Sequence, residues 1–213
     1  MKKILAAFVG VVVLAAAGLS LWHFLGTSSP VATIGTDKVT VSDVNDSVNE
    51  ILAERKGVST TGMQLATGAD LTLAEVNFHV IAYLLADTAS ENLVNVTQAE
   101  IASRRANIVT QVGGESKLSK ALVAANIAQK DFPLYLHTIL FEEGLNALVI
   151  KEGVNQVNAT PAVQALIVAE AIKVGIVVNP KFGKWDETQV GVVRSTSSVM
   201  TSPGSTPAPS VSK

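Results

Sequence analysis

The stretch VATIGTDKVTVSDV, residues 31–44, predicts a strand, a tight turn, a second strand and the start of a helix. β-Branched residues alternate on both sides of the turn, as they do in short strands. The turn itself falls on Gly35-Thr36-Asp37, which carry turn-forming side chains. Ser42 or Asp43 can cap the helix that follows. A small sheet therefore opens the folded part of the chain.

The rest of the folded part is expected to be helical. Residues 72–92 are apolar around almost their whole circumference, which predicts a central helix packed on several sides. Thr72 with Glu75, and Thr97 with Glu100, have the spacing of capping boxes. Loop composition marks residues 57–70, with room for a short helical turn near 63–66. The predicted helices are residues 42–56, 72–92, 97–112, 115–125, 131–151 and 160–174.

A short apolar run after the last helix predicts a third strand. Ile176–Val178 needs a strand partner, and the pair at residues 31–41 is the obvious one. This pairing would bring the two ends of the domain together. The predicted fold class is therefore mainly α, a multi-helix domain closed by a small β-sheet from its N- and C-terminal segments. Residues 194–213 are rich in Ser, Thr and Pro and predict a disordered tail.

The N-terminus predicts insertion into a membrane. Lys2 and Lys3 precede an apolar run at residues 4–25, about 33 Å long as a helix and enough to span a bilayer. The lysines favour a cytoplasmic start, so the domain after the 27–30 linker would be extracytoplasmic. Residues 1–26 are then a signal-anchor, giving a single-pass protein of the cell membrane. Alternatively, cleavage after the small residues at 15–17 would release a secreted protein.

Composition excludes several classes of function. The 213 residues contain no cysteine, so disulfides, thiolate metal sites and thiol catalysis are excluded. Residues 1–26 hold two of the 16 basic residues and no acidic residue, which leaves 14 basic and 18 acidic side chains and a net charge of −4. A mildly acidic chain is a poor match for a nucleic-acid surface.

Catalytic and metal-binding motifs are also missing from the sequence. The three histidines, His23, His79 and His137, have no second His, Cys or paired acid at metal-ligand spacing. We expect His79 and His137 to be surface or satisfied interior residues rather than ligands or bases. Phosphate loops, serine-nucleophile elbows and zinc-helix motifs do not occur. The sequence therefore predicts neither an enzyme, nor a metal site, nor a small-molecule cofactor. A deep pocket holding His79 or His137 beside acidic residues would support the alternative hypothesis of an enzyme with an unrecognised site.

Several segments in their order resemble the SurA N-terminal domain family, which PrsA-like foldases share. Residues 31–34 and 39–40 match the opening of that family, and Gly35-Thr36 replace its usual Asn-Gly. Residues 96–108, 113–122 and 130–140 resemble its helices. Residues 177–186, VVNPKFGKWD, resemble actinobacterial members. The resemblance covers residues 31–193 and implies an extracytoplasmic chaperone fold that binds unfolded or extended polypeptide. Longer relatives carry a parvulin prolyl isomerase domain, for which this chain has no room.

Two functions follow as hypotheses. The first is a membrane-anchored or secreted chaperone-like module that holds client segments by apolar burial, without catalysis. Its candidate peptide-binding residues are aromatic: Phe78, Tyr83, Phe132, Tyr135, Phe141 and Trp185. Trp185 has a structural alternative, in which it and Phe182 anchor a bend of the chain against the core. The second hypothesis is an envelope adaptor that binds one specific folded partner.

Overall fold

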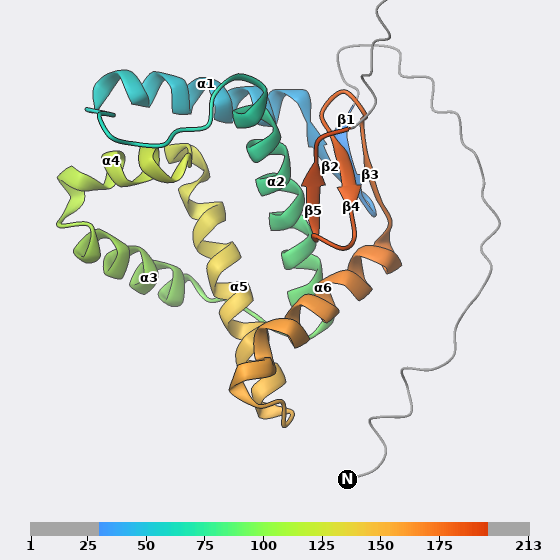
Figure 1. The fold of residues 1–213 in the computed structure, drawn as a ribbon. Helices are drawn as coiled ribbons and strands as arrows, with labels where there is room; N and C mark the ends of the chain where they lie inside the picture. Colours follow the sequence, from blue (N-terminus) through green and yellow to red (C-terminus); the bar gives the residue numbers. More distant parts are fainter. Residues whose placement is uncertain (1–29, 196–213) are drawn as a thin grey trace, which may run out of the picture.

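The computed structural model describes residues 30–195 as a mainly helical domain with two small sheets (Figure 1). The predicted membrane or signal segment 1–26 and the tail from residue 196 onward lie outside the described residues. Pro30, assigned to the linker by sequence, is the first residue of β1. The elements in chain order are β1 Pro30–Ile34, β2 Asp37–Thr40, α1 Val41–Gly57, α2 Gly68–Glu91, α3 Gln98–Gln111, α4 Glu115–Ala125, η1 Gln129–Asp131, α5 Phe132–Lys151, η2 Gln156–Asn158, α6 Ala159–Val174, β3 Ile176–Val178, β4 Lys184–Asp186 and β5 Gly191–Val193.

The first sheet pairs β1, at the start of the described residues, with β3, which follows the last helix and precedes the second hairpin. Its strand order is β2-β1-β3, and both pairings are antiparallel. Ala32 of β1 lies opposite Val178 of β3, so the run Ile176–Val178 pairs with a strand of the 31–41 pair, as expected. Gly35 has a φ of +54° in the β1–β2 turn, a conformation that glycine adopts without steric cost. Its N–H donates to the Gly175 carbonyl at 3.1 Å, so the turn is also tied to the end of α6.

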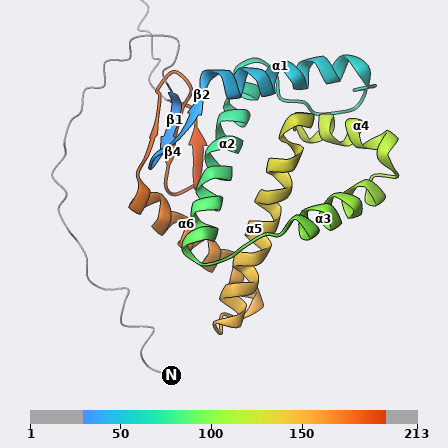
Figure 2. The same cartoon turned by 180° about the vertical axis from the view of Figure 1, so that it is seen from behind.

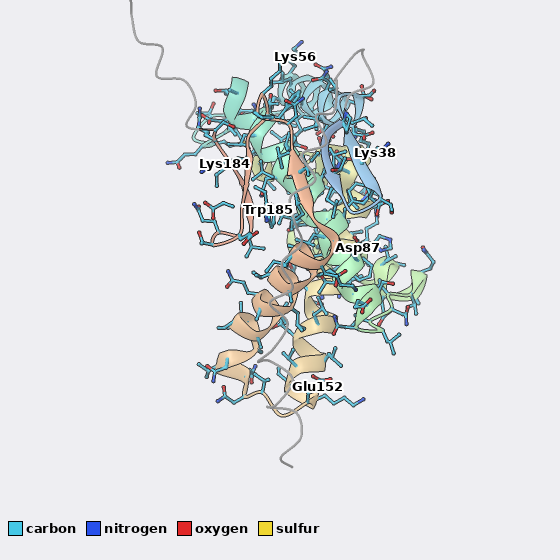
Figure 3. All side chains as sticks on the ribbon, turned by 90° about the vertical axis from the view of Figure 1, so that its right-hand side faces the viewer. Lys38, Lys56, Asp87, Glu152, Lys184 and Trp185 are labelled. Carbon is cyan, nitrogen blue, oxygen red and sulfur yellow. The ribbon has the colours of Figure 1, made fainter. Side chains whose placement is uncertain are left out.

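A second hairpin, which the sequence did not predict, follows the first sheet. Strands β4 and β5 pair antiparallel, and β4 lies against β3. Strand β5 packs on α2, where Asn77 Oδ1 accepts a hydrogen bond of 2.7 Å from the Val192 N–H. Phe182 and Trp185 are half-buried against the same apolar cluster as the first sheet. Figure 3 views this side of the domain, with Trp185 near the middle of the face. The structural interpretation of the aromatic bend therefore agrees with the packing.

Helix α2 is the central element of the fold. It lies between the sheets on one side and α5 on the other (Figures 1 and 2) and packs against α1, α5, α6, β1 and β5. Ten of its residues are buried, which confirms the prediction of a central helix. The Thr72–Glu75 capping box is wrong, because α2 already begins at Gly68. Thr72 Oγ1 donates instead to the Gly68 carbonyl, and Glu75 is buried within the helix.

Two capping boxes of the predicted kind do form. At α3 the Thr97–Glu100 box is present as predicted. At α1 the N-cap is Thr40, and Asp43 completes its box from the third helical position, so neither Ser42 nor Asp43 is the cap itself. Helix α6 is capped at Asn158 rather than Thr160. The loop between α1 and α2 has no helical turn at residues 63–66.

Helices α3 and α4 form a thinner layer away from the sheets (Figure 2). Helix α3 has no fully buried residue, and its apolar side packs half-exposed on α5. The small core beneath these helices is built from Leu118, Leu122, Phe132 and Leu136. This layer reaches α1 through α4 and η1, and that junction contains the polar cluster described next.

Candidate functional site

The predicted aromatic residues do not form one surface. Phe132 is buried in the α4–α5 core, where Tyr135 stacks on it at a ring-centroid distance of 6.5 Å. Phe141 lies beside His137 further along α5, at 5.8 Å. On α2, Phe78 is half-buried, and Tyr83 is 37% exposed.

Trp185, on β4, belongs to the sheet cluster. The six aromatics are therefore spread over separate parts of the fold. A peptide-binding role for any of them stays a prediction.

The structure instead brings together a buried polar cluster where α1, α2 and η1 meet. It contains Ser47 from α1, Glu75 and His79 from α2, and Asp131 from the end of η1, none more than 7% exposed. Lys130, with its side chain 37% exposed, reaches the cluster from the surface. Glu75 and His79 are four residues apart, so both project from the same face of α2. We refer to these five residues as the polar cluster.

Ser47 Oγ is the centre of the hydrogen bonding in the polar cluster. It lies 2.6 Å from Asp131 Oδ2, 3.1 Å from His79 Nε2 and 2.9 Å from Lys130 Nζ. A hydroxyl donates one hydrogen bond and accepts two. Ser47 Oγ also lies 2.9 Å from the Asp43 carbonyl oxygen. The carboxylate and the carbonyl can only accept and the ammonium can only donate, so Asp131 and Asp43 compete for the single serine proton. The role of His79 Nε2 in its contact with Ser47 depends on the tautomer of the ring.

Lys130 closes the network from the solvent side. Its Nζ also donates to Asp131 Oδ1 at 2.9 Å and to Oδ2 at 3.2 Å. The ammonium thus balances one of the two buried carboxylates. Residue Glu75 is different, since no hydrogen bond or ion pair to its carboxylate is found within residues 30–195.

The electrostatic environment reflects this imbalance. Burial, with a smaller contribution from the nearby charge of Asp131, raises the pKa of Glu75 to about 7, although the charges of Lys130 and Arg55 act in the opposite direction. Burial lowers the pKa of His79, although Asp131 partly opposes that shift. Both residues are therefore held toward their neutral forms near pH 7, because charge in a buried site is costly without a partner.

The polar side of α1 fixes η1 in place beside the cluster. Glu50 Oε1 accepts from the Lys130 N–H at 3.2 Å, and Glu54 Oε1 accepts from the Gln129 N–H at 3.0 Å. Arg55 donates to Asn126 Oδ1 at 2.6 Å, just after α4. These contacts tie the backbone of η1 to α1, so the position of Lys130 and Asp131 depends on α1.

The residue types in the cluster allow two kinds of chemistry. Serine, histidine and aspartate occur together in nucleophilic catalysis, but Ser47 is fully buried and lines neither of the two cavities described below. Metal binding requires only convergent ligand atoms. One ligand atom each from Glu75, His79 and Asp131 lie within 4.8 Å of one another. These three residues could hold a cation.

Sequence reasoning missed this cluster. It placed Glu75 in a helix cap and Asp131 in a first helical turn, and it treated His79 as an isolated residue. One signal was available, because Ser47 occupies the apolar stripe of α1 together with Val44 and Ile51, all three of which are buried. A serine at a core position needs a buried hydrogen-bond partner.

An apolar groove lies between α2, α5 and α6, with a volume of about 260 Å³. We call it the α6 groove. Glu142, Thr160 and Gln164 supply its polar positions. Its apolar lining residues are Ile81, Leu85, Val163, Ile167 and Val190.

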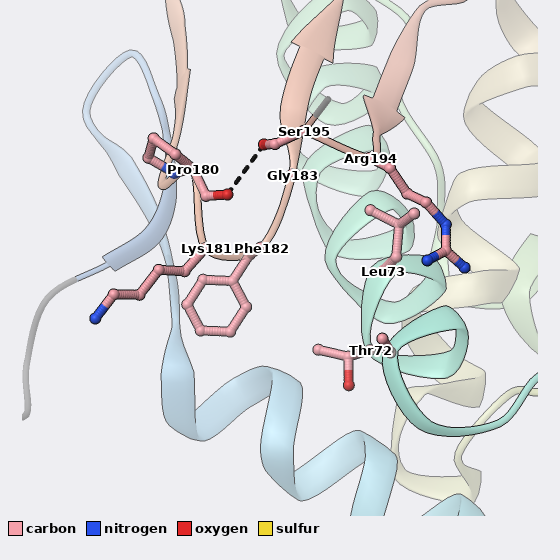
Figure 4. Close-up of a pocket in the computed structure, with 9 residues that line it drawn as sticks. Thr72, Leu73, Pro180, Lys181, Phe182, Gly183, Arg194 and Ser195 are labelled. Carbon is pink, nitrogen blue, oxygen red and sulfur yellow. Dashed lines mark hydrogen bonds between the residues drawn. The ribbon is translucent and has the colours of Figure 1, made fainter. Parts of the chain in front are cut away.

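A second cavity, of about 440 Å³, lies between the start of α2 and the segments that flank the second hairpin (Figure 4). Its lining mixes Leu73 and Phe182 with the cations Lys181 and Arg194. Arg194 pairs with Asp70 in the first turn of α2, and Ser195 Oγ donates to the Pro180 carbonyl at 3.0 Å. Arg194 and Ser195 are therefore already engaged by other parts of the domain.

The fold and its cavities define a mainly helical domain with a small sheet. No protein-family model, curated protein or solved structure matches the chain. Among the described residues, Gly68–Glu91 and Gln156–Val174 are long and apolar enough to cross a membrane. Length and composition alone give weak support, since core helices of soluble proteins pass the same test.

Proposed function

We propose that this domain holds extended or unfolded polypeptide segments in the α6 groove, by apolar burial and without catalysis. In this proposal residues 4–25 anchor it to the cell membrane as a single span with the domain outside, or cleavage releases it. The observation that carries the proposal is the exposure of an apolar helix. Only 22% of the apolar window in Gln156–Val174 is buried, and on α6 Ile172 is 63% exposed. An apolar helix that stays at the surface is typical of a binding face.

The shape and chemistry of the α6 groove support an extended chain as the occupant. Its apolar lining offers burial to side chains, worth about 1.5–3 kcal/mol for each large apolar side chain that is fully removed from water. Glu142, Thr160 and Gln164 can bond the backbone of a bound segment, which an extended chain leaves free. A volume of about 260 Å³ is small and suits one or two side chains at a time. Binding of this kind is weak and tolerant of sequence.

Backbone strain at the groove also supports a binding role. Val190 lines the groove with a φ of +49°, in the left-handed region that β-branched residues avoid. Strain of this kind costs about 1–3 kcal/mol and concentrates at functional sites. Asn or Gly would adopt this turn conformation more easily. Valine instead adds apolar surface to the lining of the groove.

Val190 allows a test in which folding and binding change in opposite directions. Val190→Asn relieves the backbone conformation and removes apolar lining, so we expect unchanged or higher stability and weaker holding. The matched control is Leu93→Asn, because Leu93 also has a positive φ, of +57°, and is 84% exposed but does not line the groove. The full chain in lipid nanodiscs would be mixed with a urea-denatured client, and light scattering would report aggregation.

We expect the wild type and Leu93→Asn to suppress aggregation of the client. In Val190→Asn this suppression should be at least severalfold weaker. Equal suppression by all three proteins, or by none, would refute the groove as the holding site. Crosslinking from position 164 identifies the occupant, and capture of residues 1–29 or 196–213 of the chain itself would also count against a client site.

The adaptor hypothesis has one observation in its favour. Ile172 and Val177 are both large, apolar and more than 60% exposed, and they flank the junction of α6 and β3. A single stoichiometric folded partner that loses affinity in Ile172→Ser, while client holding is unaffected, would support the adaptor. The resemblance to the SurA N-terminal family agrees with holding of unfolded chains and remains part of the proposal.

A further inference from the structure

We propose that Glu75, His79 and Asp131 form a binding site for one divalent transition-metal ion, with Zn²⁺ the best chemical match. These three residues have no metal-ligand spacing in the sequence, because Asp131 lies 52 positions after His79. The structure places one ligand atom of each residue within 4.8 Å of the other two. His79 Nε2 lies 4.0 Å from Asp131 Oδ2.

The unpartnered Glu75 carboxylate is the second observation that points to a cation. Glu75 is 2% exposed and converges on His79 and Asp131, yet it makes no hydrogen bond or ion pair within the described residues. A buried carboxylate without a partner is costly. The charges of Lys130 and Arg55 both act on Glu75, but Lys130 is bound to Asp131 and Ser47, and Arg55 donates to Asn126, so neither cation is bound to the Glu75 carboxylate. A divalent ion would balance both carboxylates.

The ligand set selects the class of metal. One imidazole nitrogen with two carboxylate oxygens suits Zn²⁺, Mn²⁺ or Co²⁺, and bonds of about 2.0–2.2 Å place tetrahedral ligands about 3.4 Å apart. The ligand atoms therefore need to close in by about 1 Å. Three protein ligands leave a position open for water. Ser47 Oγ, which donates to Asp131 Oδ2 at 2.6 Å, would orient that carboxylate from outside the site, while a metal bound to His79 Nε2 would replace the contact of that nitrogen with Ser47.

Lys130 and the metal are alternative occupants of the space beside Asp131. The ammonium lies 2.9 Å from Asp131 Oδ1, where a cation bound to that carboxylate would repel it. Because the Lys130 side chain is 37% exposed, it can turn into water when the metal enters. Removing this lysine should therefore strengthen metal binding. A purely structural ionic network predicts no such gain.

The test uses the metal-free full chain in nanodiscs, titrated with Zn²⁺ in a calorimeter and with Co²⁺ in the visible spectrophotometer. We expect one ion per chain and a tetrahedral Co²⁺ spectrum. Lys130→Met should raise the affinity severalfold. Glu75→Gln keeps the size of the side chain and should lower the affinity at least about tenfold. His137→Gln, on α5 and outside the cluster, is the matched control and should bind like the wild type.

Circular dichroism checks that each variant is folded, and Asp131→Asn replaces Glu75→Gln if that variant is not. Absence of stoichiometric binding in both the wild type and Lys130→Met would overturn the proposal. So would binding that Glu75→Gln and Asp131→Asn leave unchanged, or binding that His137→Gln removes. The client-holding assay with Val190→Asn is independent of these measurements, so either proposal can fail alone.

Discussion

Substitution of Ser47 by alanine tests whether the polar cluster stabilises the fold. Ser47 is fully buried, and its Oγ contacts Asp131, His79 and Lys130. In Ser47→Ala the aspartate and the lysine keep their mutual hydrogen bonds. His79 Nε2 loses the hydrogen bond to Ser47 in a site that is only 6% exposed. The variant therefore leaves His79 Nε2 without its Ser47 contact and removes one hydrogen bond from the buried Asp131 carboxylate.

The magnitude follows from opposing contributions. An unsatisfied buried polar group costs about 1–3 kcal/mol, and a hydrogen bond to a charged group is worth about 1.5–3 kcal/mol. Asp131 retains Lys130, so only part of the second value is lost. Alanine is the better helix former by about 0.5 kcal/mol and offsets some of the cost. We expect a net loss of about 1–2.5 kcal/mol in the free energy of unfolding.

Urea denaturation followed by circular dichroism, with a chelator present, measures this loss. Ser103→Ala is the matched control, because Ser103 is an exposed residue inside α3 and should change stability by no more than a few tenths of a kcal/mol, in the stabilising direction. A Ser47→Ala protein as stable as the Ser103→Ala protein would refute the reasoning. It would mean that the hydrogen bonds of Ser47 contribute nothing net to folding.

Two further predictions concern helix packing and helix capping. A Cβ on Gly144 of α5 would overlap Val94 Cγ1, so Gly144→Ala should destabilise the domain by about 1–3 kcal/mol despite alanine's helix preference, and adding Val94→Ala should recover part of the loss in urea denaturation. Burial raises the pKa of Asp43, but the hydrogen bonds from Thr40 outweigh it and hold that pKa below its usual value. The ionised Asp43 carboxylate therefore contributes to the free energy of unfolding above about pH 4, and this stabilisation is lost as the pH falls through the folded-state pKa. The stability difference between wild type and Asp43→Asn should shrink on acidification, and a constant difference would contradict the assignment.

The helices could be predicted because their signals are local. The apolar circumference of residues 72–92, the Thr97–Glu100 box and Pro133 in a first turn all act within a few residues of one another. The same local pattern is misleading at Thr72. A threonine three residues before a glutamate has the pattern of a cap, but α2 starts earlier, so Glu75 points into the core. Pattern alone cannot distinguish a capping carboxylate from a buried one.

The polar cluster and the second hairpin were missed for a different reason. Ser47, Glu75 and Asp131 are brought together by tertiary packing across 84 positions of sequence, and no local period connects them. In the hairpin, β4 and β5 have three residues each, too short for an alternating pattern to be recognised. Strand β5 depends on α2, through packing and through the hydrogen bond from the Val192 N–H to Asn77, and β4 depends on its neighbours β3 and β5.

Stability alone does not explain why α2 carries acid and imidazole groups in its buried face. Further along the same helix, Ile81 and Leu85 line the α6 groove, and the remaining core positions are apolar except Thr88, whose hydroxyl donates to the Leu84 carbonyl. Replacing buried charged groups by apolar residues of similar size is often neutral or stabilising. Glu75 and His79 lie one turn apart opposite a third potential ligand, Asp131. A ligand held at the polar cluster gives these residues a role that packing does not, since a bound cation would convert the cost of burying Glu75 into binding energy.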